Sequence, residues 1–295
     1  MTFRRIFISM VFCSTLALCL AAQDARGGFR SHPVRIPGGS NVFVYGINDS
    51  GEMVANYTDA AGTNHCATIT GNIITEIADP KAVGTGPGKG TTCFGINNAG
   101  QVVGAYSLDV FSNGFAYTGG QYVDIVVPGA TAGTVAVGLN NIGNIVGYYA
   151  DDVTTHGFLY VVQTNTYGTL NMPGASATLG VAINDSGLTT LQWLDLNGVR
   201  HGGTFQAGGY TPLDVPNSLQ SAADGVNAQG QIIFRAKDTS GIFHAYLYSN
   251  GTFTQFDVAN AADTHGFGIN SSTQIVGAYN PARDPTTQIG FEGHF

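Results

Sequence analysis

Short runs in which apolar and polar residues alternate recur along the chain, and tight turns separate them. Residues 176–183 and 188–193 flank a turn at 184–187, and two further runs, 201–205 and 210–215, follow a polar loop. Alternation with period two predicts half-buried strands, and Asn and Gly favour the left-handed backbone angles of tight turns. The pattern therefore predicts four short antiparallel strands in succession. No stretch shows the sustained 3.6-residue periodicity of long helices.

This four-strand unit occurs six times. Its marker is Gly-Ile-Asn-x-x-Gly, with small variations, and it begins near residues 46, 95, 138, 182, 225 and 268. A period in the forties with four strands per repeat is typical of β-propeller blades. The sixth unit lacks a fourth strand, and residues 31–37 match the fourth-strand pattern of residues 210–216. We therefore predict an all-β, six-bladed β-propeller with four-stranded antiparallel blades, whose last blade is closed by the N-terminal strand.

The first residues are typical of a secretory signal peptide. A basic pair at positions 4 and 5 precedes an apolar run from Ile6 to Leu20, and two alanines follow. The run is shorter than the roughly 20 apolar residues that span a bilayer. We predict a signal peptide at 1–22, a single propeller domain at 23–295, and a secreted protein, extracellular or periplasmic, without stable membrane insertion. A lipoprotein signal at Cys19 and a retained membrane anchor are the alternatives.

Charge and cysteine usage narrow the classes of partner. Charged residues make up only 10% of the chain, and the formal net charge is −8. Nucleic acids and anionic membranes require basic patches, so we expect a monomer that binds neither. Two of the four cysteines fall within the predicted signal peptide, which leaves Cys66 and Cys93. Export permits a disulfide, but the repeat assigns these cysteines to non-equivalent strands of successive units. We therefore expect two free thiols, with the bridge as the alternative.

The predicted third strands begin with a recurring His. Four of them start His65-Cys66-Ala67, His156-Gly157-Phe158, His201-Gly202-Gly203 and His244-Ala245-Tyr246. Together with Gly-Ile-Asn-x-x-Gly-x-x-Val-Gly-x-Tyr, these starts resemble the HAF-type extracellular repeats of bacterial exported proteins. The resemblance covers the whole mature chain and implies an exported repeat protein, but the family has no common biochemical function. Asn113 and Ile289 depart from it at the His position.

An acidic residue precedes each of these histidines. Asp59, Asp195 and Asp238 precede theirs by six positions, and Asp152 precedes His156 by four. We interpret these as Asp–His pairs that fix the loop between the second and third strands. Equivalent positions in different blades lie too far apart to share a zinc ion, whose ligand distances are about 2 Å. We therefore predict no metal site, and the sequence indicates no particular cofactor.

A single site in a repeat protein must break the repeat, so outliers at equivalent positions are the candidates. The residue before the motif is apolar in five units and Asp224 in the fifth. Two positions earlier the outlier is His265, and on the second strand it is Arg235. Asp224 and Arg235 are diagonal neighbours on one face of the same predicted hairpin. Lys237 and Asp263 lie near the ends of the adjoining strands, so the fifth and sixth blades share a polar cluster.

Two interpretations of this cluster stay open. It is either an ion pair that replaces an apolar contact between blades, or a ligand or catalytic site. For the second interpretation, the candidate catalytic residues are Asp224, Arg235 and His265. The candidate ligand-binding residues are Lys237, Asp263, Tyr148, Gln192 and Asn56.

Three functions fit these observations. The first is an exported binding module for a glycan or another extracellular polymer, because Tyr, Asn, Gln and Gly suit the faces and hydroxyls of sugars. The second is a polysaccharide-acting enzyme. A lyase would use Arg235 to neutralise a uronate and His265 as base, whereas a hydrolase would need two facing carboxylates, for which Asp224 and Asp263 are the pair. The third is a structural or adhesive scaffold for a protein partner. The sequence favours a non-enzymatic module without excluding an enzyme.

Overall fold

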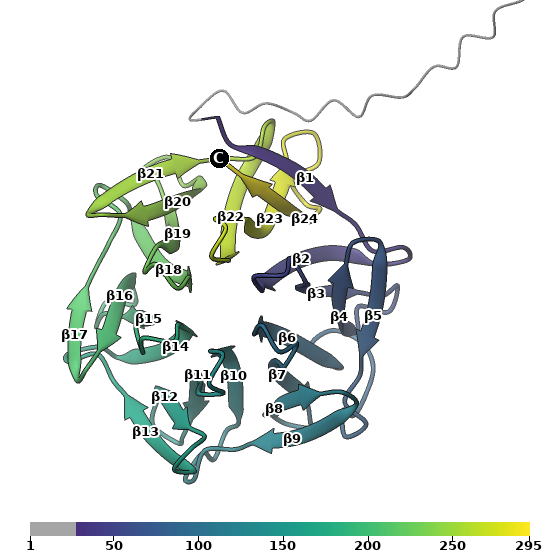
Figure 1. The fold of residues 1–295 in the computed structure, drawn as a ribbon, viewed down its shortest axis with the longest axis vertical. Helices are drawn as coiled ribbons and strands as arrows, with labels where there is room; N and C mark the ends of the chain where they lie inside the picture. Colours follow the sequence, from purple (N-terminus) through teal and green to yellow (C-terminus); the bar gives the residue numbers. More distant parts are fainter. Residues whose placement is uncertain (1–27) are drawn as a thin grey trace, which may run out of the picture.

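The structure is a computed structural model that describes residues 28–295. Six four-stranded antiparallel sheets surround a central axis as the blades of a closed ring (Figure 1). This arrangement confirms the predicted six-bladed β-propeller. The predicted signal peptide, 1–22, lies outside the described residues. Within residues 28–295 the structure has no helix with the length and apolar character needed to cross a membrane.

Each blade runs outward from the axis, first strand innermost. The first blade contains β2 (Ser40–Ile47), β3 (Met53–Thr58), β4 (Asn64–Thr70) and β5 (Ile73–Ile77). The second contains β6 (Thr91–Ile96), β7 (Val102–Ser107), β8 (Ser112–Thr118) and β9 (Gln121–Ile125). The third contains β10 (Thr134–Leu139), β11 (Ile145–Ala150), β12 (Thr155–Val161) and β13 (Thr166–Leu170). The fourth contains β14 (Ala177–Ile183), β15 (Thr189–Leu194), β16 (Arg200–Gln206) and β17 (Gly209–Pro212).

The last two blades complete the ring. The fifth contains β18 (Gln220–Val226), β19 (Ile232–Lys237), β20 (Phe243–Ser249) and β21 (Thr252–Phe256). The sixth contains β22 (Ala261–Ile269), β23 (Ile275–Pro281), β24 (Ile289–His294) and, as its outer strand, β1 (Arg30–Val34). β1 pairs antiparallel with β24, from Arg30 opposite His294 to Val34 opposite Gly290. The N-terminal strand therefore closes the last blade, as the sequence predicts, and leaves β24 without a free edge.

The first glycine of the motif allows the innermost strands to approach one another. A Cβ on Gly95 would lie 2.8 Å from the Val137 carbonyl oxygen of the next blade, and one on Gly138 would lie 2.5 Å from the Val181 carbonyl oxygen. Such distances are too short for a Cβ, so glycine lets the inner strands approach this closely at these positions; the fourth blade has Ala182 at the equivalent position. The small residue at the first motif position thus allows the inner strands to lie this close to one another around the axis.

The motif asparagines form a closed ring of hydrogen bonds around the axis. Each side-chain amide donates to the backbone carbonyl of the equivalent Asn in the next blade, and Asn270 Nδ2 closes the ring by donating to the Asn48 oxygen at 3.1 Å. Our expectation that these asparagines adopt left-handed backbone angles is wrong. In the first five motifs the last Gly has a positive φ, and in the sixth Thr273 does. The Asn oxygen instead accepts backbone N–H groups of its own turn, as in Asx turns.

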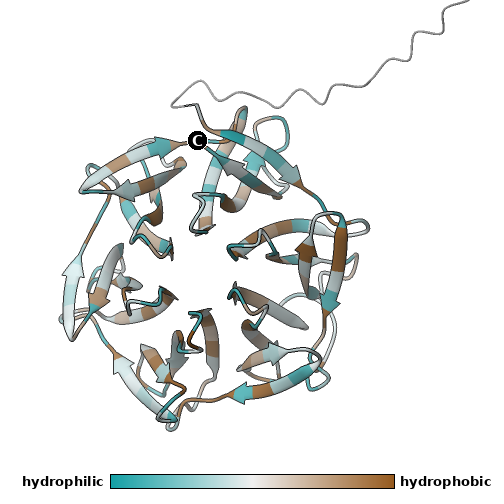
Figure 2. Ribbon diagram, in the orientation of Figure 1, coloured by the Kyte–Doolittle hydropathy of each residue, from teal (hydrophilic) through white to brown (hydrophobic). Residues whose placement is uncertain are grey.

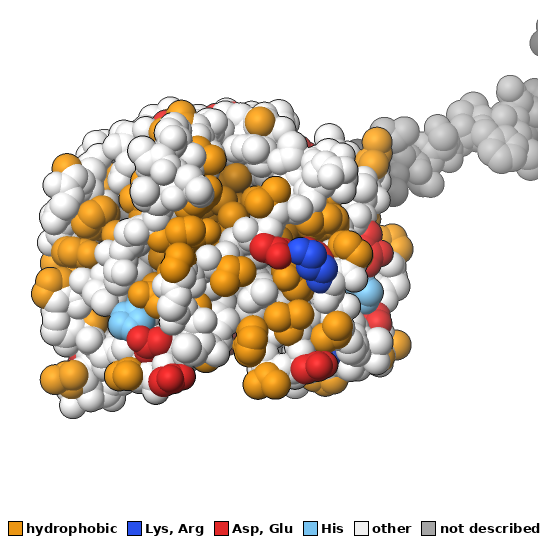
Figure 3. Space-filling view, turned by 90° about the horizontal axis from the view of Figure 1, so that it is seen from below, with side chains coloured by type: hydrophobic (Ala, Val, Ile, Leu, Met, Phe, Trp, Pro, Cys, Tyr) orange, Lys and Arg blue, Asp and Glu red, His pale blue; other side chains and the backbone are white. Residues whose placement is uncertain are grey.

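Hydrophobic side chains fill the spaces between neighbouring blades. Each buried cluster combines residues of two blades, for example Val54 and Ile77 of the first blade with Ile96 and Phe115 of the second. Along single strands, hydrophobic and hydrophilic residues interchange (Figure 2). The side of the ring shown in Figure 3 carries few charged side chains, in keeping with the 10% of charged residues in the sequence. The core is therefore a circle of interfaces between blades.

Cys66 and Cys93 form a disulfide with a Cα–Cα distance of 5.4 Å, so our expectation of two free thiols is wrong. Cys66 lies on the third strand of the first blade, and Cys93 on the first strand of the second. Around the whole ring the third strand of one blade packs against the first strand of the next. Elsewhere the third-strand position is Gly or Ala, and the first-strand position is Gly, Ala or, in the first blade, Val44. A Cβ on Gly157 would lie 3.2 Å from Gly180 N. Non-equivalent strands of successive units are therefore neighbours in space.

Candidate functional site

The innermost strands surround a cavity of about 210 Å³ on the axis. The residue before the motif lines it in all six blades: Tyr45, Phe94, Val137, Val181, Asp224 and Phe267. Five of these six side chains are apolar or aromatic, and only the fifth blade contributes a carboxylate. The position that the sequence identified as an outlier therefore faces the centre of the ring.

A second set of apolar residues forms the floor of this cavity. The residues at the second motif position line both this cavity and a polar space of about 80 Å³ at the asparagine turns: Ile47, Ile96, Leu139, Ile183, Val226 and Ile269. These side chains lie between the two spaces. The larger cavity thus has an apolar floor, a largely aromatic wall and one polar sector.

Asp224 is the centre of the polar sector. Its side chain is 5% exposed, and its Oδ1 accepts a hydrogen bond of 2.9 Å from Gln192 Nε2 of the fourth blade. Its Oδ2 lies 3.2 Å from Arg235 Nε. This oxygen is buried and accepts no hydrogen bond from the described residues. Burial raises the pKa of Asp224 to about 6, although Arg235 and Arg200 oppose the rise. Loss of solvation therefore outweighs the attraction of both cations.

Arg235 reaches Asp224 from the adjoining strand of the same blade. Arg235 is opposite Ala222, as the predicted hairpin register requires, and a bulge between Ala223 and Val226 places Asp224 beside it. The ion pair between the two predicted residues is confirmed. The guanidinium carbon also lies 5.3 Å from the centre of the Phe267 ring, a cation–π arrangement. The Arg235 side chain is 28% exposed, so it borders the mouth of the cavity.

Sequence reasoning missed a second arginine at this site. Arg200, at the start of β16, donates from Nη1 to Gln192 Oε1 at 2.8 Å. Gln192 therefore links Arg200 to Asp224. The other blades carry Asn64, Ser112, Thr155, Phe243 and Gln288 at the equivalent position. Arg200 is the charged outlier of that set, and the comparison that found Arg235 would have found it.

Aromatic rings of the first, second and sixth blades cover much of the remaining wall. The Tyr45 ring lies 4.8 Å from that of Phe267 and 5.1 Å from that of Phe94, measured between ring centres. Burial raises the pKa of Tyr45 to about 12, so its hydroxyl stays protonated and can donate a hydrogen bond. Tyr148, a predicted ligand-binding residue, lines the same cavity from the third blade. Such a wall offers flat apolar surfaces with hydroxyl groups at their edges.

The remaining predicted residues lie outside the cavity wall. The His265 ring stands 5.0 Å from that of Phe243, and its Nδ1 is buried without a partner in the described chain. Burial, with help from Arg235, lowers the pKa of His265 to about 4, which makes it a weak base at neutral pH. Asp263 Oδ1 accepts a 2.7 Å hydrogen bond from Phe243 N. Lys237 Nζ lies 5.6 Å from the centre of the Phe243 ring.

The predicted residues thus separate into two groups. Asp224, Arg235, Gln192 and Tyr148 share the cavity wall. Asn56 is buried between blades, where its Oδ1 accepts a 2.8 Å hydrogen bond from Cys93 N. Asp224 is the sole carboxylate among the described residues that line the cavity. The structure therefore does not bring a second carboxylate, such as Asp263, to the position that a glycosidase pair requires.

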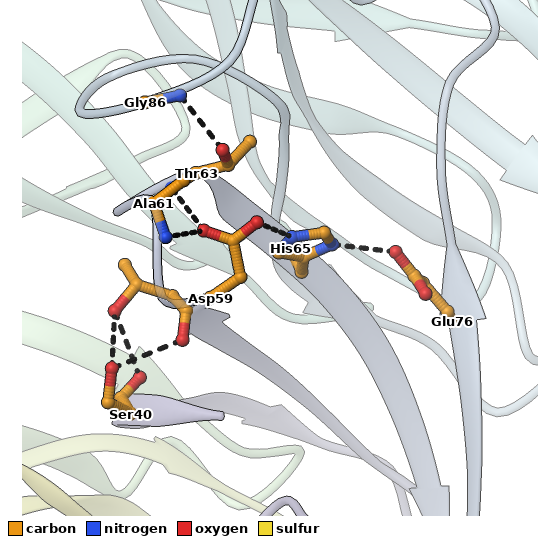
Figure 4. A network of polar contacts seen from close by, with 8 residues as sticks. Ser40, Asp59, Ala61, Thr63, His65, Glu76 and Gly86 are labelled. Atoms are coloured by element: carbon orange, nitrogen blue, oxygen red, sulfur yellow. Dashed lines mark hydrogen bonds and ion pairs between the residues drawn. The ribbon is translucent and has the colours of Figure 1, made fainter. Parts of the chain in front are cut away.

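The repeated histidines form a separate network on the blades. His65 Nε2 lies 3.3 Å from Asp59 Oδ2, and Nδ1 lies 2.7 Å from Glu76 Oε1 (Figure 4). Asp59 also accepts the backbone N–H groups of Ala61 and Thr63. Although partial burial opposes it, the hydrogen bonds with Glu76 and Asp59 raise the pKa of His65. The acid on the fourth strand was absent from our prediction.

Similar networks occur in three other blades. His201 lies between Asp195 and Asp214, and His244 between Asp238 and Asp257. The expected loop pairs are therefore confirmed in the first, fourth and fifth blades. In the third blade the expected partner, Asp152, is wrong. His156 pairs with Asp151 at 3.0 Å, whereas Asp152 accepts a hydrogen bond from Thr131. Asp151 also caps the turn, because it accepts two backbone N–H groups.

Comparisons with known proteins support the fold. No family model and no curated protein sequence matches the chain. The six-bladed fucose lectin of Aleuria aurantia superimposes with a TM-score of 0.51 at 12% identity, over 86% of this chain and 91% of the lectin. AofleA of Arthrobotrys oligospora gives 0.56 at 12% identity, over 90% and 88%. TolB of Acinetobacter baumannii gives 0.54 at 8% identity, over 86% of this chain and 63% of TolB. At such identities the likeness establishes the fold alone.

Proposed function

We propose that this propeller is a carbohydrate-binding module with one binding site, in the cavity on its axis. The observation that carries the proposal is the combination of an aromatic wall with a single polar sector. Tyr45, Phe94 and Phe267 offer ring faces, while Asp224, Gln192 and Arg235 offer acceptors and donors. A sugar ring has the same division, with apolar C–H faces and hydroxyl groups around its rim.

The size of the cavity supports a small ligand. Its volume of about 210 Å³ is below the roughly 300–1,000 Å³ of drug-sized pockets. The apolar floor further limits how far a ligand can enter. The site therefore suits one sugar ring at the end of a longer glycan. Six-bladed propellers of similar fold include a fucose-specific lectin from Aleuria aurantia, which supports a role in carbohydrate binding for this architecture.

We also propose that the protein is exported and belongs to the HAF-type repeat proteins. The Cys66–Cys93 disulfide supports export, because disulfides persist in oxidising compartments. Extracellular or periplasmic glycans are then the available ligands. The repeated Asp–His networks have a structural role in this proposal, because each lies within its own blade and outside the cavity wall.

A cavity-filling variant tests the site. Phe occupies the wall position in the second and sixth blades, so the fold accommodates Phe there. We therefore expect Val137→Phe combined with Val181→Phe to fill the cavity without unfolding the protein. Isothermal titration calorimetry with a panel of neutral and acidic oligosaccharides should show binding to the wild type at one site per chain, and at least tenfold weaker binding to the variant.

Val123→Phe is the matched control, because Val123 is 61% exposed on an outer strand. It should bind like the wild type. Equal affinity of the cavity-filled variant and the wild type would contradict the proposed site. Product release should be measured on the same samples. If the wild type releases sugar from any substrate and the cavity-filled variant does not, the protein is an enzyme and the proposal of a non-enzymatic binding module is wrong.

A further inference from the structure

More positive than negative groups lie at and beside the polar sector of the cavity. Arg235 lines the cavity and forms an ion pair with Asp224, the one carboxylate there. Arg200 is not a lining residue but lies beside the sector, hydrogen-bonded to the lining residue Gln192. The chain as a whole has a formal charge of −8, so this local excess of positive charge is unusual for the molecule. Arg200 is paired with the neutral amide of Gln192 instead of with an acid.

Much of the hydrogen-bonding capacity of these arginines is unused. A guanidinium carries five N–H donors. Within residues 28–295, the Arg200 side chain donates one hydrogen bond. Arg235 makes its ion pair through Nε, and its two terminal nitrogens donate no hydrogen bond within these residues, although the guanidinium stacks over Phe267. Planar groups with parallel N–H bonds match a carboxylate better than they match scattered hydroxyls.

The charges around Arg200 also favour binding of an anion. Burial and the nearby charge of Arg235 lower the pKa of Arg200, and the attraction of Asp224 does not compensate. An additional anion at this position would therefore be stabilised by both cations. Asp224 Oδ2 supplies a complementary feature, because within residues 28–295 it has the ion pair with Arg235 but accepts no hydrogen bond. A ligand with both a carboxylate and a neighbouring hydroxyl would satisfy both features.

We infer that the sugar bound in the axial cavity is acidic, with its carboxylate on Arg200 and Arg235 and a ring hydroxyl donating to Asp224. This inference rests on the proposed function and adds the class of ligand. A uronic acid at the end of an oligosaccharide has this chemistry. A neutral hexose would satisfy Asp224 and the aromatic wall but would leave the two guanidinium groups without an anion.

Matched oligosaccharides that differ in one carboxylate test the inference. Trisaccharides ending in glucose or glucuronate, and in galactose or galacturonate, should be titrated into the wild type by calorimetry. We expect the acidic member of at least one pair to bind at least tenfold more tightly than its neutral partner. This preference should decrease as the salt concentration rises, because salt screens exposed charges.

Arg200→Gln separates charge recognition from the rest of the site. It removes the cation while Asp224, Arg235 and the aromatic wall remain, so the preference for acid should fall to about threefold or less with unchanged binding of the neutral member. Arg283→Gln, on an exposed loop of the sixth blade, removes the same charge far from the cavity and should retain the full preference. Melting curves of both variants should match that of the wild type.

The outcomes distinguish the inference from the proposed function. Equal binding of acidic and neutral members, abolished by the cavity-filling pair Val137→Phe and Val181→Phe, would overturn the acidic class and leave the carbohydrate module standing. A full acid preference in Arg200→Gln would also overturn the inference. No binding of any member to the wild type would overturn the proposed function and the inference together.

Discussion

The buried carboxylate at the centre of the ring makes a quantitative prediction about stability and pH. Asp224 has a pKa of about 6 in the folded protein, against an ordinary value near 3.8. Because the folded pKa is raised, the folded state binds the proton more tightly than the unfolded state. Asp224 therefore favours folding fully below pH 3.8, and this contribution is lost as the pH rises through 6. A difference of about two pKa units, at 1.36 kcal/mol each, corresponds to about 3 kcal/mol.

Asp224→Asn removes this titration, together with the ion pair that the ionised wild type forms with Arg235. The amide has almost the same shape as the carboxylic acid, and its oxygen can still accept the hydrogen bond from Gln192. We expect the variant to gain about 3 kcal/mol relative to the wild type between pH 3.5 and pH 7.5. Other groups titrate over this range in both proteins, so their contributions cancel in the difference.

Urea unfolding at five or six pH values measures this difference. Trp193, the only tryptophan in the sequence, stacks on His201 with ring centres 4.3 Å apart, so its fluorescence should report unfolding of the fourth blade. Circular dichroism should give coincident transitions if unfolding is two-state. Parallel stability curves for the wild type and the variant would refute the reasoning, because Asp224 would then ionise equally easily in both states.

Three further perturbations test other parts of the structure. Arg235→Ala leaves Asp224 without its ion-pair partner and should lower the free energy of unfolding by about 2–3 kcal/mol at pH 7.5. The loss should be small at pH 3.5, because Asp224 is then protonated. In urea titrations, the double variant with Asp224→Asn should recover most of the loss. Cys66→Ala opens a loop closed across 27 positions and should cost about 3.5 kcal/mol by loop-closure entropy, measured by thermal melting beside the reduced wild type. Asn140→Ala breaks the hydrogen-bonded ring and should lower the free energy of unfolding by about 2 kcal/mol. Asn141→Ala, at the exposed neighbouring position, should lower it by less than about 1 kcal/mol. Equal losses for the two variants in urea unfolding would contradict a stabilising role for the ring.

The candidate site was only partly predictable from the sequence. Asp224 and Arg235 were accessible because they break a six-fold pattern and belong to one hairpin, where register is a local property. Gln192 was a candidate by position alone, and its contact with Asp224 joins the fourth and fifth blades. Arg200 could have been found by the same search for outliers. Asn56 shares a repeat position with Gln192, yet it is buried against Cys93, because neighbouring blades differ in what they pack against it.

The sequence by itself determined the number of blades, the order of strands within them and the closure by the N-terminal strand. These properties depend on alternation, turn residues and repeat length, all of which are local. The tertiary structure decided the contacts between blades: the disulfide, the asparagine ring and the shared cavity wall. Such contacts depend on which strand of one blade faces which strand of the next, and on how closely the inner strands converge. A sequence repeat does not give the distances between blades, because aligning the repeats shows which positions are equivalent but not which side chains of neighbouring blades are in contact.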